Sequence, residues 1–191
     1  MKKELIEIET LKQLERMNKE NKVRPSLMTP KHYDGSMIVT NSFVAIKVDG
    51  GRYKEDNRTD YPNNAIQLFS ADPVEWIELP LTDMKALKEI AASFKRLKET
   101  NIIITFDTNN FTIDGYHNNV KTFLPYQDVT LSGDIVSKSI SMNPKYIEQI
   151  LAYYIKLQAT SVTLEWISER NPIKFTSGPV QYLASQMHNR R

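Results

Sequence analysis

The chain has 191 residues, 40% of them hydrophobic and 25% charged, which suffices for one domain of ordinary size, or one domain and a fragment. Its 25 basic and 23 acidic residues give a net charge of +2, so bulk charge alone indicates no nucleic-acid partner. The lack of cysteine excludes disulfides, thiolate metal sites and cysteine nucleophiles. No apolar run approaches the roughly 20 residues that span a bilayer, and none follows Met1 as in a signal peptide. We therefore expect a soluble cytoplasmic protein with no membrane partner.

A weak threefold pattern runs along the chain, in which a short strand precedes an amphipathic helix and paired strands that stop near a glycine. In the first unit the strand, helix, hairpin strands and closing strand are expected at 5–8, 10–21, 37–40, 43–48 and 65–69. In the second they are expected at 76–79, 82–99, 102–106, 111–113 and 120–124. In the third they are expected at 139–142, 143–158, 162–167, 173–175 and 180–184. Each unit is thus predicted to be β-α-β-β-β.

Local signals mark the helix starts and the connecting segments. Thr10, Thr82 and Asn143 are candidate N-caps, because their side-chain oxygens can accept from free N–H groups of the first turn. Pro144 strengthens the third start, because its fixed φ suits the first helical position. The polar stretch 51–64 is predicted to be an exposed loop, and 126–138 is a candidate domain linker.

Each expected helix has an apolar stripe and basic residues on the other side. The stripes consist of Leu11, Leu14 and Met17, then Leu87, Ile90, Ala91, Phe94 and Leu97, then Ile147, Ile150, Leu151, Tyr154 and Leu157. Helices set side by side would form a positive surface that holds a phosphate backbone without reading bases. The candidate DNA-binding residues are Lys12, Arg16, Lys19, Lys22, Arg24, Lys85, Lys88, Lys95, Arg96, Lys145 and Lys156. The alternative is an ordinary solvated face, which acidic neighbours such as Glu15 and Glu89 favour.

Residue patterns for chemistry are missing from the sequence. None of the three histidines, His32, His117 and His188, has the spacing of a metal site. The chain has no Gly-x-Ser-x-Gly elbow and no glycine-rich phosphate loop. We therefore expect no catalytic residue, no metal and no cofactor, and we expect Trp76 and Trp166 to lie in the core.

Several segments resemble the bacterial DNA polymerase III β subunit, the sliding clamp. Residues 23–27 are similar to its Arg-x-x-Leu segment, and 34–45 to a hairpin that carries Ala-Thr-Asp-Gly-His-Arg-Leu-Ala. Thr40 is kept there, while Asn41, Ser42, Phe43 and Val44 replace Asp, Gly, His and Arg. Residues 121–129 resemble a Phe-Pro-Asp-Tyr type segment and 141–147 a Phe-Asn-x-x-Tyr-Leu helix start. Residues 182–188 lie where clamps end in Tyr-x-x-Met-Pro-Met-Arg.

The resemblance implies an α+β, sliding-clamp-like fold of three β-α-β-β-β units with helices packed on antiparallel sheets. Residues 1–131 would form one complete clamp-like domain of two units, and 136–191 half of a second. The implied function is a non-catalytic processivity scaffold that binds or encircles double-stranded DNA and tethers DNA polymerase or other replication proteins, in a shortened form that would fit a phage. Ser185, Gln186 and His188 depart from the family's partner-peptide pocket, as does the missing half-domain.

Two further hypotheses concern partners. The alternative to a DNA scaffold is an interaction module that binds a polymerase or a host clamp through exposed sheet edges. A half-domain is also expected to associate with a second copy through the apolar face of its helix, formed by Ile147, Ile150, Leu151 and Tyr154. Four chains of three helices would match the helix count of a family ring, so we expect a tetramer, or otherwise a dimer.

Overall fold

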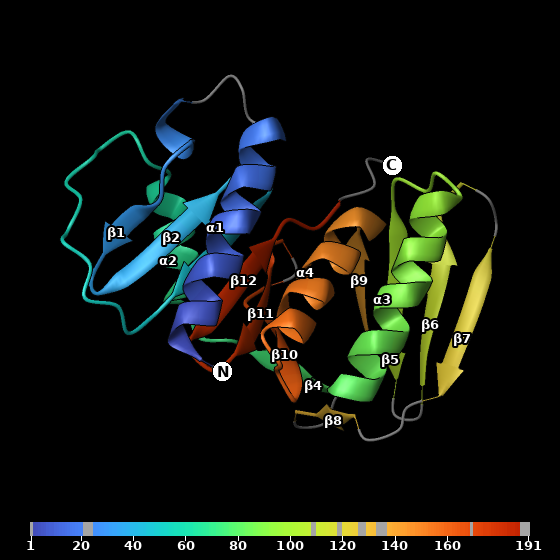
Figure 1. Cartoon of the computed structure of the whole chain (residues 1–191). Helices are drawn as coiled ribbons and strands as arrows, with labels where there is room; N and C mark the ends of the chain where they lie inside the picture. The colour runs from blue at the N-terminus through green and yellow to red at the C-terminus, as the bar shows by residue number, and fades with distance from the viewer. Residues whose placement is uncertain are drawn as a thin grey trace.

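The computed structural model describes residues 2–20, 25–107, 110–117, 120–125, 129–132, 137–168 and 170–187 (Figure 1). The helices are α1 (Lys3–Glu20), a short 3-10 turn at Pro25–Leu27, α2 (Asn63–Phe69), α3 (Leu81–Arg96) and α4 (Pro144–Lys156). The strands are β1 (Lys31–Tyr33), β2 (Ser36–Thr40), β3 (Val44–Val48), β4 (Glu75–Pro80), β5 (Ile102–Asp107), β6 (Asn110–Gly115), β7 (Lys121–Pro125), β8 (Thr130–Leu131), β9 (Ser137–Met142), β10 (Ser161–Trp166), β11 (Ile173–Ser177) and β12 (Val180–Ala184).

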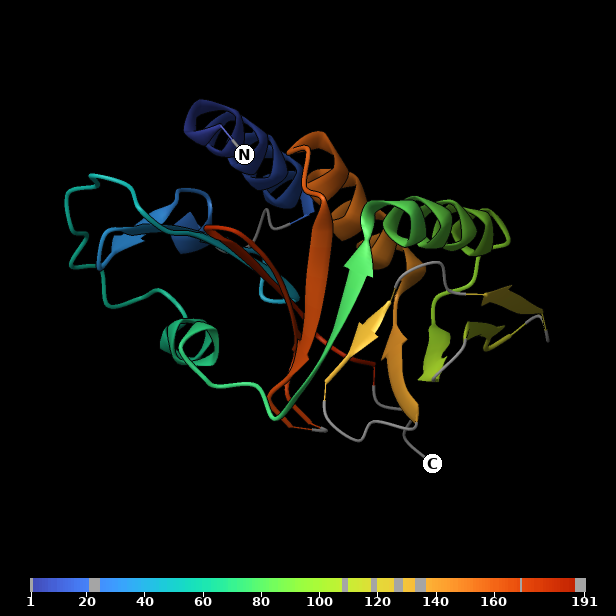
Figure 2. The same ribbon diagram turned by 90° about the horizontal axis from the view of Figure 1, so that it is seen from below.

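Two antiparallel sheets form one layer, and three helices cover one face of it. The larger sheet has the order β1-β2-β3-β12-β11-β10-β4-β8, and the smaller has the order β7-β6-β5-β9. Figure 2 shows α1, α4 and α3 on the same side of both sheets, with α2 on the opposite side. The main core lies between the three helices and the sheets, and a smaller apolar cluster lies under α2. This arrangement confirms the predicted α+β fold class.

The second and third units exchange their first strands. β4, from the second unit, pairs with β10, and β9, from the third unit, pairs with β5. Helices α3 and α4 of these two units also pack against each other. The first unit joins them along one strand pair, β3 with β12. Strand pairing therefore connects the third unit both to the second and to the first.

The C-terminal ends of α3 and α4 have the same local geometry. Each helix is followed by a left-handed residue, Lys98 with φ 62° and Gln158 with φ 59°. The next N–H along the chain then donates to the carbonyl of Phe94 or Tyr154, at 3.1 Å in both cases. This bond pattern satisfies carbonyls that the helix end leaves without partners.

Some local predictions are confirmed and others are wrong. Asn143 is the N-cap of α4, since its Oδ1 accepts from the N–H of Lys145 at 2.9 Å. The predicted strand at 5–8 lies in α1, which makes Thr10 an interior helical residue. Buried Ile6 and Thr10 lie one turn apart, so the short strand-like alternation was the weaker of two overlapping patterns. Thr82 follows the first residue of α3, and 65–69 lie in α2, so both predictions are wrong. Leu11 and Leu97, which the sequence placed in the apolar stripes, are 44% and 50% exposed.

Candidate functional site

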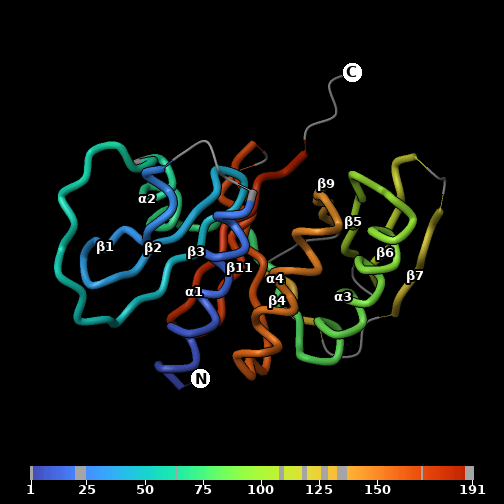
Figure 3. Tube along the Cα trace, turned by 45° about the horizontal axis from the view of Figure 1, so that its top comes forward, coloured from blue at the N-terminus to red at the C-terminus, as the bar shows by residue number. Residues whose placement is uncertain are grey.

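The face formed by α1, α4 and α3 is the first candidate site. The three helices follow one another across the molecule in that order (Figure 3). A buried contact fixes α1 beside α4, because the hydroxyls of Thr10 and Tyr153 lie 2.7 Å apart. An ion pair between Lys95 and Glu148 joins α3 to α4. The helix face is thus a continuous surface with defined spacing.

Charge is unevenly distributed over this face. Helix α3 has four basic and two acidic residues, and α4 has two basic and one acidic residue. Helix α1 has five acidic and four basic residues, so its sequence is slightly acidic. Of the described exposed residues on α1, Lys3, Lys12, Arg16 and Lys19 are basic and Glu4 and Glu15 are acidic, so its exposed side is basic although its whole sequence is not.

Most of the candidate DNA-binding residues lie on the exposed side of the helices. Lys88 and Lys145 are half-buried, and Lys22 and Arg24 lie outside the described residues. The exposed residues are Lys12, Arg16, Lys19, Lys85, Lys95, Arg96 and Lys156. Ion pairs reduce the free charge, with Lys88 2.7 Å from Glu89 and Lys12 2.7 Å from Glu9. Within the described part of the chain, Arg16, Lys19 and Lys85 make no ion pair, so their charges are available to an anion.

Glu9 is a buried acid at the junction of α1 and α4. Its carboxylate accepts from Lys12, and the ammonium of Lys156 lies 3.6 Å from its second oxygen. The hydrogen bond from Lys12 holds the pKa of Glu9 below its ordinary value, against the opposing effect of burial. Glu9 thus neutralises part of the positive charge of Lys12 and Lys156, two of the candidate DNA-binding residues.

The four residues expected at an interface between chains lie inside this chain. Ile147 is 1% exposed, and Ile150, Leu151 and Tyr154 are fully buried. The strands of the second and third units cover this helix face, because the exchanged strands complete both sheets around it. That interface prediction is therefore wrong for these side chains, and any contact between chains uses other residues.

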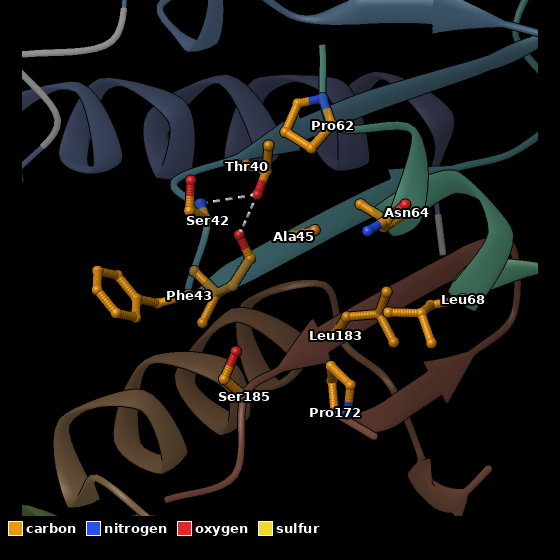
Figure 4. A pocket seen from close by; sticks show the side chains of 12 residues that line it. Thr40, Ser42, Phe43, Ala45, Pro62, Asn64, Leu68, Pro172, Leu183 and Ser185 are labelled. Carbon is orange, nitrogen blue, oxygen red and sulfur yellow. Dashed lines mark hydrogen bonds between the residues drawn. The ribbon is translucent and has the colours of Figure 1, made fainter. Parts of the chain in front are cut away.

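The second candidate site is an apolar cavity of about 250 Å³ between the β2–β3 turn, α2 and the end of β12. Its lining side chains include Thr40, Phe43, Pro62, Leu68, Pro172 and Leu183. In Figure 4 the side chains of Leu68, Leu183 and Pro172 lie around one space. The Phe43 ring is 59% exposed, so an apolar side chain is available where the cavity opens.

A rigid turn presents Phe43 beside this cavity. Thr40 Oγ1 accepts from the N–H of Ser42 at 3.1 Å and donates to the carbonyl of Val44 at 2.7 Å. The Asn41 side chain accepts from the N–H groups of Phe43 and Val44 at 3.0 and 2.9 Å. Ser42 has φ 73°, in the left-handed region that glycine adopts at less cost. The backbone of the turn is thus fixed by its own side chains.

Sequence reasoning did not assign the cavity as a site, although part of its lining comes from two segments that carried the family resemblance. Thr40–Ala45 and the end of β12, about 140 residues apart in the sequence, meet because β3 pairs with β12. Leu183 and Ser185 come from the terminal segment whose departures argued against a peptide pocket. Both segments were recognised in the sequence, but only the β3–β12 pairing shows that they lie side by side.

Candidate metal ligands are not clustered in the described ranges, where no three or more His, Asp or Glu side chains gather at one point. The His32 ring stacks on Tyr53, with 4.7 Å between centroids, and His117 lies 3.1 Å from the hydroxyl of Thr100. His188 lies outside the described residues. Of the helices described, none is long and apolar enough to cross a membrane.

Solved structures with a similar fold are bacterial sliding clamps. The chain is similar to the β subunit of DNA polymerase from Streptococcus pyogenes, with a TM-score of 0.67 and 13% identity, covering 93% of this chain and 64% of that one. For DNA polymerase III subunit beta from Borrelia burgdorferi the TM-score is 0.62 and the identity 12%, over 84% of this chain and 55% of that one. For the Helicobacter pylori beta clamp bound to a DNA ligase peptide the TM-score is 0.53 and the identity 14%, over 82% of this chain and 42% of that one.

These similarities confirm the predicted resemblance at the level of the fold. The chain spans less than two thirds of the length of each of these proteins. No protein-family model and no curated protein sequence matches it. The chain therefore has a sliding-clamp fold that matches part of the length of these proteins, and a shared fold does not by itself establish a shared function.

Proposed function

We propose that the chain is a non-catalytic, clamp-like scaffold that holds duplex DNA against its helix face and tethers a replication protein. The observation that carries this proposal is the row of α1, α4 and α3 on one face of a sliding-clamp fold. Three exposed cations that make no ion pair with the residues the structure describes, Arg16, Lys19 and Lys85, favour contact with phosphates. Contacts to phosphates carry no sequence information, so binding is expected to be independent of sequence.

The cavity supports the tethering part of the proposal. It has the size of a small ligand site and an apolar lining, which suits one or two apolar side chains of a peptide. The Helicobacter pylori beta clamp is bound to a DNA ligase peptide, and such a peptide is a reasonable first probe. We expect contact with the side chains of Phe43, Leu68 and Leu183.

The strand exchange also supports a domain division. We propose that 71–187 form a complete clamp-like domain, because β4 and β9 each complete the other unit's sheet. Residues 2–70 then form the half-domain, attached through β3 and β12. The cavity lies at the junction of the two parts, which would make its shape sensitive to their relative position.

Fluorescence anisotropy with labelled duplex DNA over a salt series tests the DNA part. We expect similar affinities for unrelated sequences and a linear fall of log affinity with log salt. Binding that is absent at low salt would refute this part. For the cavity, we expect the ligase peptide to bind the wild type and to bind Phe43→Ser more weakly, with Tyr33→Ser as a control at an exposed position remote from the cavity.

A specific observation favours the alternative function. The ion pairs of Lys12, Lys88 and Lys95 reduce the positive charge that the helix face offers to DNA. An interaction module that binds a replication protein through the cavity would require none of it. Peptide binding without any affinity for DNA is the result that would select this function.

A further inference from the structure

A buried ion pair joins two neighbouring strands of the larger sheet. The ammonium of Lys174 on β11 lies 2.7 Å from Oε2 of Glu165 on β10, and the two residues are directly opposed in the antiparallel ladder. Their side chains are 6% and 12% exposed. Removing two charges from water often costs as much as their attraction returns, so a buried pair is weak evidence for stability. The other contact of Lys174 indicates what the pair does.

The ion pair lies on the face of the sheet that α2 covers. Lys174 is opposed to Leu183 of β12, which belongs to the apolar cluster under α2, and directly opposed side chains of an antiparallel pair lie on the same face. Figure 2 shows α2 on this side and α1, α3 and α4 on the other. The ammonium of Lys174 also donates to the carbonyl of Ala71 at 3.1 Å, two residues beyond the end of α2 at Phe69. The pair thus connects the sheet to the end of α2.

Helix α2 depends on contacts with the sheet for its position. It has seven residues, and isolated helices shorter than about 12–15 residues are marginal in water. Its N-cap residue is Pro62, which has no side-chain acceptor for the free N–H groups of the first turn. Next to this end, the hydroxyl of Tyr61 donates to the carbonyl of Ile38 at 3.0 Å. Tyr61 and Lys174 therefore hold the two ends of α2 on the sheet.

Helix α2 also forms one wall of the apolar cavity. Ala65 and Leu68 line the cavity from α2, and Pro172 and Leu183 line it from the sheet side. Figure 4 shows Leu68, Leu183 and Pro172 around one space. Lys174 follows Pro172 by two residues and is opposed to Leu183, so it adjoins the sheet side of the cavity while it holds the α2 side. The width of the cavity therefore depends on Lys174, although Lys174 is not one of its lining residues.

We propose that Lys174, held in place by Glu165, is a positioning residue for this cavity. It fixes α2 at the distance from β11 and β12 at which an apolar side chain of a partner can enter. This role rests on the proposed tethering function, in which the cavity receives a peptide. A wall that is already in place strengthens binding, because it does not have to be ordered when the peptide arrives.

Replacing both charges separates positioning from stability. Lys174→Met alone leaves Glu165 as a buried charge without its partner, which destabilises a fold strongly. The double variant Lys174→Met with Glu165→Met has no such charge, and its urea midpoint should lie close to that of the wild type. The matched control is Lys138→Met with Glu75→Met, which removes an ion pair between β9 and β4 whose residues do not line the cavity.

Two measurements on the double variant test the proposal. In hydrogen exchange followed by mass spectrometry, the amides of 63–71 should exchange about tenfold faster than in the wild type, while those of β10, β11 and β12 keep their protection. The DNA ligase peptide should bind about tenfold more weakly, because binding then has to order α2. The control variant should match the wild type in both measurements.

The outcomes distinguish this role from the proposed function. Unchanged exchange in α2, or faster exchange in α2 with unchanged peptide affinity, overturns the proposal. A strongly lowered urea midpoint of the double variant also overturns it, since the pair would then stabilise the whole fold. A wild type that binds no peptide refutes the tethering function alone, and the exchange of α2 then decides whether Lys174 positions this helix.

Discussion

The two partners in the contact between Thr10 and Tyr153 should contribute unequally to the stability of the fold. The Thr10 hydroxyl donates to the carbonyl of Ile6 at 2.7 Å and lies 2.7 Å from the Tyr153 hydroxyl. A hydroxyl has one hydrogen, so Tyr153 has to donate to Thr10. Both side chains are fully buried, and no water can replace a lost partner without a rearrangement.

The substitution Thr10→Val keeps the shape of the side chain and leaves the buried Tyr153 O–H without its acceptor. An orphaned buried polar group costs about 1–3 kcal/mol. Tyr153→Phe removes the donor, while Thr10 still bonds to Ile6, so the loss should be about 0.5–1.5 kcal/mol. The double variant removes both polar atoms and should be more stable than the sum of the single losses implies, with a coupling on the order of 1 kcal/mol.

Urea unfolding of the wild type, both single variants and the double variant measures these differences. The denaturant slopes should agree among the four proteins, which shows that the same surface is exposed on unfolding. Additive losses, or a Tyr153→Phe variant less stable than Thr10→Val, would contradict the assigned donor and acceptor. The result bears on function, because this bond sets α1 beside α4 on the helix face.

Three further predictions concern stability. Ser42→Gly should stabilise the fold by roughly 0.5–1 kcal/mol in thermal unfolding, because Ser42 has φ 73°. Leu151→Ala should cost about 2–5 kcal/mol, since the side chain is fully buried, and half-exposed Leu97→Ala should change stability by about 0.5 kcal/mol or less. Lys12 lowers the pKa of Glu9, so ionised Glu9 stabilises the fold above its unfolded pKa. The stability lost in Glu9→Gln at neutral pH should therefore shrink as pH falls through the folded pKa of Glu9, in urea midpoints across acidic pH.

The sequence predicted those elements whose local signals agree with one another. For α4, the Asn143 cap, Pro144 and the apolar spacing from Ile147 all indicate the same helix. Apolar positions were equally informative, since Phe94 and Leu151 are buried as expected, with 2% and 0% exposed. The prediction failed where a short pattern had two interpretations, as in residues 5–8.

The strand pairing between units and the cavity were not predictable from local pattern. Strands β4 and β9 look alike as first strands of a unit, and nothing in their sequences specifies which sheet each completes. The cavity depends on the β3–β12 pair, which brings Ala45 opposite Leu183. Such long-range pairing is decided by the whole fold, since each strand alone could fit more than one edge.

The helix-face hypothesis leads to a quantitative prediction for DNA binding. Lys85 makes no ion pair in the described part of the chain, Arg96 bonds to a serine hydroxyl, and Lys88 is paired with Glu89. Each phosphate contact contributes about 0.9 to the slope of log affinity against log salt, so Lys85→Ala, Lys88→Ala and Arg96→Ala together should flatten the slope by about 2 to 3.

The matched control removes the same positive charge elsewhere. Arg52, Lys54 and Arg170 are exposed and lie in segments outside the helices. Their combined change to alanine should leave the slope nearly unchanged, although it lowers net charge equally. A general charge effect would weaken both variants alike, and a DNA-free interaction module would respond to neither. The two variants remove the same amount of charge from different places. Only a flatter slope confined to the helix-face variant therefore supports contact between DNA and α3.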